Sequence, residues 1–130
     1  MGSVPGGDDM AMPTVLLVDD DAQIRGAVRD LLVAEGHRVL TARNGVEAHA
    51  LAEAHPPSAI VLDLLMPVAG GWDLVSRLRE LGLEDVPVIL FSGSADLENE
   101  ARRIGAARWL RKPCPFDRLL GALREVLPRS

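Results

Sequence analysis

The sequence contains a single cysteine, Cys114, among its 130 residues, so it cannot form an internal disulfide. This agrees with a reducing compartment. No apolar run approaches the roughly 18 residues that a membrane span requires, and residues 1–13 lack the basic start and apolar stretch of a secretory signal. These absences predict a cytoplasmic protein, and the Gly, Pro and Asp content of residues 1–13 predicts a flexible tail.

Negative charge dominates the composition, with a formal net charge of -5. Nucleic acid is therefore not an expected partner, and the short apolar runs argue against a membrane. The charge is uneven, because residues 1–98 hold six basic and sixteen acidic side chains, whereas residues 99–130 hold eight and three. The basic excess is either a set of solvated or paired surface arginines or a surface that faces a partner.

Short apolar runs rich in Val, Ile and Leu predict five strands, at residues 15–18, 39–40, 59–62, 88–91 and 109–110. Runs with little alternation are typical of parallel strands that are buried on both faces. Apolar residues spaced three and four apart predict helices between and after these strands, within residues 24–32, 44–55, 74–81, 97–104 and 116–127. Because the two kinds of element alternate without an internal repeat or linker, we predict one doubly wound α/β domain over residues 14–127.

Two helix starts carry capping signals. Asp21 directly precedes the first helix and is placed to cap it. Asn44 is followed three residues later by Glu47, which is the arrangement of a capping box.

Polar side chains follow four of the predicted strands. Asp19 and Asp20 follow the first strand, Asp63 the third, Ser92 the fourth and Lys112 the fifth. Because ligands of such sheets bind beyond the carboxyl ends of the strands, we expect these side chains to lie together. Clustered carboxylates raise each other's pKa, and Mg²⁺, which prefers hard oxygen ligands, would relieve that repulsion. No cluster of His or Cys competes for a softer metal.

Asp63 stands alone at its strand end and is the candidate nucleophile toward phosphorus, which would give an aspartyl phosphate. Asp19 and Asp20 are adjacent and better placed to bind the ion. Lys112 would supply a positive charge to the phosphoryl group, and the Ser92 hydroxyl a hydrogen bond. Taken singly, each residue could serve only in a turn, in a helix cap or at the surface, so the combination carries the prediction.

Four segments resemble the response-regulator receiver domains of two-component signalling: VLLVDDD (15–21), IVLDLLMP (60–67), VILFSG (88–93) and KP (112–113). The resemblance implies a flavodoxin-like (βα)5 sandwich with parallel strand order 2-1-3-4-5. It implies that Asp63 accepts a phosphoryl group from the phosphohistidine of a histidine kinase or histidine phosphotransfer protein. It also implies that Mg²⁺ is bound by Asp19, Asp20, Asp63 and the backbone carbonyl of Leu65, with Lys112 and Ser92 completing the catalytic residues.

The resemblance further implies a switch in which phosphorylation draws Ser92 inward and Trp109, at the position of the family's switch aromatic, follows. The face made by the helix near residues 97–104, the strand at 109–110 and the last helix would then change. That face is the expected site for an output partner or a second copy. Trp109 could instead be a half-buried packing residue.

Two other functions can be set beside this one. A haloacid-dehalogenase-like phosphatase also forms an aspartyl phosphate. That family has an Asp-x-Asp motif that begins at the nucleophile, and in this sequence Leu65 takes the place of the second Asp. A degenerate receiver that only binds partners is disfavoured because none of the site residues is missing. We therefore expect no enzyme beyond self-phosphorylation and self-dephosphorylation, in a stand-alone receiver or one excised from a larger regulator or hybrid kinase.

Overall fold

The computed structural model describes residues 13–64 and 71–127, in which five parallel strands alternate with five helices. The strands are β1 (Thr14–Val18), β2 (Arg38–Ala42), β3 (Ala59–Leu62), β4 (Val88–Ser92) and β5 (Arg108–Arg111). The helices are α2 (Ala22–Ala34), α3 (Gly45–Ala54), α4 (Gly71–Glu80), α5 (Leu97–Ile104) and α6 (Phe116–Val126). The sheet order β2-β1-β3-β4-β5 confirms the predicted fold.

The three central strands are apolar apart from Thr14 and Ser92 at their ends, because they are covered on both faces. Every residue of β3 and β4 is buried, as are the last four residues of β1. The edge strands β2 and β5 are partly exposed, and in β5 only Leu110 is not an exposed residue. Burial therefore restricts the choice of side chains most strongly in the central strands.

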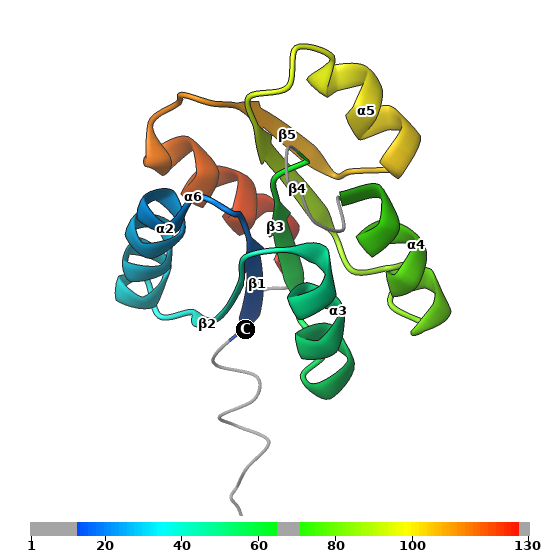
Figure 1. Ribbon diagram of the computed structural model, residues 1–130. Coiled ribbons are helices and arrows are strands. Elements are labelled where there is room, and N and C mark those ends of the chain that lie inside the picture. Colours follow the sequence, from blue (N-terminus) through cyan, green and yellow to red (C-terminus); the bar gives the residue numbers. More distant parts are fainter. Residues whose placement is uncertain (1–12, 65–70, 128–130) are drawn as a thin grey trace, which may run out of the picture.

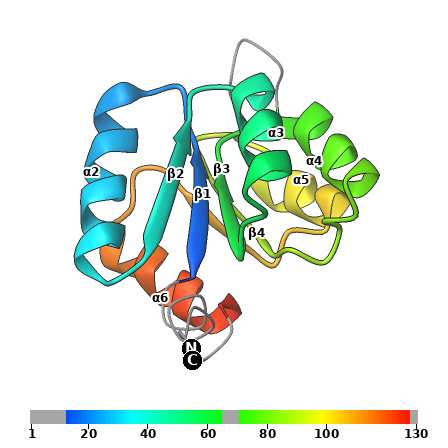
Figure 2. The ribbon, with the colours of Figure 1, turned by 90° about the horizontal axis from the view of Figure 1, so that it is seen from below.

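Helices form a layer on each side of the sheet (Figures 1 and 2): α2 and α6 cover one face, and α3, α4 and α5 cover the other. Successive residues of each strand point to opposite layers. In β4, for example, Val88 and Leu90 pack with the side chains of α3, α4 and α5, whereas Ile89 and Phe91 pack with those of α2 and α6. Two apolar cores thus hold the sheet between the helix layers, and full burial of each large side chain contributes roughly 1.5–3 kcal/mol.

Both predicted helix caps are confirmed. The Asp21 carboxylate accepts two backbone N–H groups of the first turn of α2, at 2.9 and 3.1 Å. The Asn44 side chain accepts the N–H of Glu47 at 2.9 Å. The Glu47 carboxylate in return accepts the N–H of Arg43 rather than that of Asn44, so the capping box is shifted by one residue.

Parts of the prediction fall outside the described residues, namely residues 1–12 of the predicted tail and the carbonyl of Leu65. Within residues 13–64 and 71–127, no helix has both the length and the apolar composition that crossing a bilayer requires.

Candidate functional site

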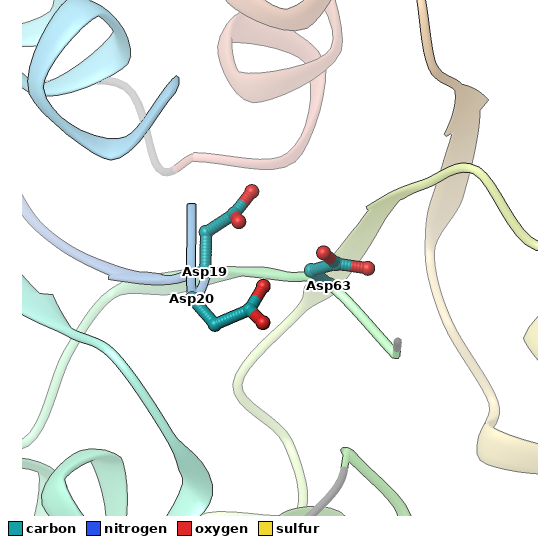
Figure 3. A group of neighbouring side chains, drawn as sticks. All are labelled: Asp19, Asp20 and Asp63. Atoms are coloured by element: carbon teal, nitrogen blue, oxygen red, sulfur yellow. The ribbon is translucent and has the colours of Figure 1, made fainter. Parts of the chain in front are cut away.

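Three carboxylates gather where β1 and β3 end (Figure 3). Asp19 and Asp20 directly follow β1, Asp63 directly follows β3, and the two strands are neighbours in the sheet. One oxygen of each carboxylate lies within 4.8 Å of the others. Asp19 and Asp63 are buried, with 2% and 6% of their surface exposed, whereas Asp20 is exposed. The cluster is therefore largely buried but reachable from solvent through Asp20.

Lys112 enters this cluster from the loop after β5. Its Nζ lies 2.6 Å from Oδ2 of Asp19 and 3.3 Å from Oδ2 of Asp63. The same ammonium lies 5.2 Å from the centre of the Phe91 ring, and the backbone N–H of Lys112 donates to the Ser92 carbonyl at 3.0 Å. Burial would lower the pKa of Lys112, but the hydrogen bond to Asp19 and the charge of Asp63 outweigh burial and raise the pKa. The site thus has a built-in cation.

Lys112 is also the sole lysine of the sequence, whose other thirteen basic residues are arginines. An ammonium group is a compact point charge that can contact two carboxylates approaching from different directions. The planar guanidinium of arginine is instead suited to both oxygens of one carboxylate. The residue type matches the position between Asp19 and Asp63.

Asp19 is held at every polar atom. Its N–H donates to the Ala42 carbonyl at 3.1 Å, and its carbonyl accepts from Nη1 of Arg25 at 2.8 Å. Its Oδ1 accepts the N–H of Asp21 at 2.9 Å, and its Oδ2 contacts Lys112. Burial nevertheless raises the pKa of Asp19, since desolvation exceeds the lowering by Lys112 and the Asp21 N–H. A rigid, partly neutralised carboxylate results.

The chemistry of these donors fits Mg²⁺. The cluster offers three carboxylates, which are hard oxygen ligands, and no sulfur or imidazole ligand belongs to it. A divalent cation bound here would offset the like charges that Lys112 alone does not neutralise.

Ser92 ends β4 and is fully buried. Its Oγ accepts the N–H of Ser94 at 3.4 Å, and among the described residues its hydroxyl donates no hydrogen bond. Trp109 pairs with Leu90 in the sheet and is 39% exposed, and whether it is a switch aromatic or a half-buried packing residue stays a prediction. Trp109 does not belong to the acidic cluster.

The arginines of residues 99–127 are exposed, and four of them pair with acidic side chains: Arg102 with Glu98, Arg103 with Asp96, Arg108 with Glu125, and Arg124 with Glu35. Exposed pairs contribute little to stability. This supports the interpretation of paired surface arginines for these four, and whether the face also meets a partner stays a prediction.

The structure brings together four predicted site residues, Asp19, Asp20, Asp63 and Lys112, and places Ser92 at the end of the strand beside β3. Sequence reasoning missed Arg25. The available signal was its position, four residues after the cap Asp21, from which a helical side chain can lean back over the end of β1.

Known proteins are similar to this chain in both sequence and fold. Residues 15–124 match the family model of the response regulator receiver domain. The chain is 36% identical over 121 residues to the transcriptional regulatory protein KdpE of Mycobacterium tuberculosis, an alignment that covers 92% of this chain and 53% of that protein. It is 32% identical over 124 residues to the phosphate regulon transcriptional regulatory protein PhoB of Pseudomonas aeruginosa, with 93% and 54% covered. The chain thus spans about half the length of these relatives.

Among solved structures, the chemotaxis protein CheY4 of Vibrio cholerae superposes with a TM-score of 0.82 at 34% identity, covering 90% of this chain and all of that one. The chain belongs to the response-regulator receiver domain family, as the four sequence segments predicted.

Proposed function

We propose that Asp63 accepts a phosphoryl group from the phosphohistidine of a histidine kinase or histidine phosphotransfer protein in the cytoplasm, and that Asp19, Asp20 and Asp63 bind the Mg²⁺ that this reaction requires. The observation that carries the proposal is the position of Asp63. One oxygen of its buried carboxylate lies within 4.8 Å of a carboxylate oxygen of Asp19 and of Asp20. The Asp63 carboxylate also lies 3.3 Å from the ammonium of Lys112, and the chain belongs to the receiver family.

In the transfer, an oxygen of Asp63 forms a bond to phosphorus while the bond from phosphorus to the imidazole nitrogen breaks, and that nitrogen keeps the electron pair. Lys112 is close enough to Asp63 to bind a phosphoryl oxygen there. The Ser92 hydroxyl can donate to another. Bound Mg²⁺ would offset the negative charge of the phosphoryl oxygens and the carboxylates. The carbonyl of Leu65 is proposed as a further ligand.

A small phosphodonor tests this assignment. Acetyl phosphate with Mg²⁺ should add one phosphoryl group to the unmodified protein and none to Asp63→Asn, as measured by intact mass, and chelation of the metal should prevent labelling. Equal labelling of both proteins would contradict the role of Asp63. The same preparation should not hydrolyse p-nitrophenyl phosphate over many turnovers, because Leu65 replaces the second carboxylate of a haloacid-dehalogenase-like phosphatase. Sustained turnover would favour the phosphatase function instead.

We also propose that phosphorylation moves Ser92 inward and that Trp109 follows, which changes the face formed by α5, β5 and α6. This proposal is supported by the exposure of Trp109 on the edge strand β5 and by the family to which the chain belongs. An output partner or a second copy would bind that face.

A further inference from the structure

Arg25 contacts the backbone of the acidic pair from the first turn of α2. Its Nη1 donates to the carbonyl oxygen of Asp19 at 2.8 Å, and its side chain is half-buried. Side chains of a helix lean toward its N-terminus, which here lies directly after the end of β1. The guanidinium therefore reaches back over the acidic pair rather than out to solvent.

The carbonyl that Arg25 holds belongs to the peptide unit joining Asp19 to Asp20. A peptide unit is planar, so fixing its oxygen also fixes the direction in which the chain enters Asp20. The Asp19 side chain has two anchors of its own, Lys112 and the N–H of Asp21. Asp20 has none: across residues 13–64 and 71–127, no hydrogen bond or ion pair holds its exposed carboxylate. Its orientation depends on the peptide unit behind it.

We propose that Arg25 is a positioning residue of the metal site, which holds the Asp19–Asp20 peptide so that the Asp20 carboxylate faces those of Asp19 and Asp63. This rests on the proposed function, because the ligand in question is the Mg²⁺ required there. Loss of a group that orients metal ligands typically weakens metal binding by about tenfold or more.

The experiment compares Mg²⁺ affinity, measured by titration calorimetry on the whole chain, for the unmodified protein, Arg25→Met and Arg29→Met. Arg29 lies one turn further along α2, is exposed and pairs only with the neighbouring Asp30 among the described residues, so its substitution makes the same charge change away from the site. The sign of the effect is informative. Loss of a positive charge alone strengthens binding of a cation, whereas loss of positioning weakens it by about tenfold.

Two further readouts separate positioning from folding. In Mg²⁺ titrations of acetyl phosphate labelling, Arg25→Met should raise the half-saturating Mg²⁺ concentration by the same factor and retain the maximal rate at saturation. Arg25→Lys keeps the positive charge and a group that can donate a hydrogen bond, so its Mg²⁺ affinity should be partly restored. If Arg25→Met lacks the circular dichroism of a folded protein, Arg25→Lys is the variant that tests the proposal.

Mg²⁺ binding as tight as or tighter than that of the unmodified protein in both Arg25 variants would overturn the positioning role and leave the proposed function intact. If the unmodified protein neither binds Mg²⁺ nor is labelled on Asp63, the proposed function is wrong and the positioning role falls with it.

Discussion

Replacing Lys112 with Met tests how much a partly buried cation stabilises this fold. Met keeps most of the side-chain length but removes the ammonium that lies 2.6 Å from Asp19 and 3.3 Å from Asp63. Both carboxylates are buried. The variant therefore keeps two buried negative charges but loses the cation between them.

Two opposing contributions determine how much the free energy of unfolding falls in Lys112→Met. At an effective dielectric constant of about 20, unit charges at these two separations attract each other by roughly 5–6 kcal/mol per pair. Removing the charged groups from water offsets most of this attraction, and breaking a buried pair on one side costs about 3–5 kcal/mol in net terms. Because 16% of the Lys112 side chain is exposed, the lower end of that range applies. We expect the free energy of unfolding to fall by about 3 kcal/mol.

Urea unfolding at pH 7 in the presence of a chelator, followed by circular dichroism, measures this loss. Arg118→Met is the control, because Arg118 is an exposed residue of α6 and its substitution removes the same charge. The control should change the free energy of unfolding by no more than about 0.5 kcal/mol. Added Mg²⁺ should stabilise Lys112→Met more than the unmodified protein, since the ion supplies the missing positive charge.

A double-mutant cycle identifies the partner. Asp19→Asn removes one of the two charges that Lys112 neutralises, so Lys112→Met should cost at least about 1 kcal/mol less in that background. Equal costs in both backgrounds, or a loss no larger than that of Arg118→Met, would refute the view that this cation stabilises the buried carboxylates.

Two other outcomes are expected. The pKa of Glu47 is lowered, mainly by the N–H of Arg43, so Glu47 adds stability above its unfolded pKa that is lost as the pH falls through the lowered folded pKa. Thermal unfolding of Glu47→Gln should thus show a deficit at neutral pH that shrinks in acid, and a constant deficit would contradict this. In a Trp72→Phe background, the fluorescence of Trp109 should shift to shorter wavelength on phosphorylation if the ring moves inward. An unchanged spectrum at full labelling would argue against the switch.

The centre of the sheet was predictable because its strands are buried on both faces, so their sequences are apolar apart from Thr14 and Ser92 at the strand ends. The predicted range of β3 agrees residue for residue with the structure. The edge strands were underestimated. β5 runs over Arg108–Arg111, but only Trp109 and Leu110 were predicted, because the arginines of an edge strand face solvent and give no apolar signal.

The site was predictable as far as strand ends determine it, which explains why Asp19, Asp63 and Lys112 were found together. Their pairing was not, since the contact between Lys112 and Asp19 joins residues 93 positions apart and depends on how the last loop returns to the sheet. The only sequence signal for the contact of Arg25 with a backbone carbonyl was its position four residues after Asp21, because the contact itself depends on the angle at which α2 leaves β1.

The lone lysine within the acidic cluster also provides a spectroscopic probe of the site. Apart from the α-amino group, the chain has one amine, and it lies between two carboxylates of the site. Isotopic labelling of lysine would give a single side-chain ammonium resonance, and that resonance would report metal binding and phosphorylation without any assignment. Amine-directed reagents would likewise mark the site and no other side chain, so protection of this amine would measure how fully the site is occupied.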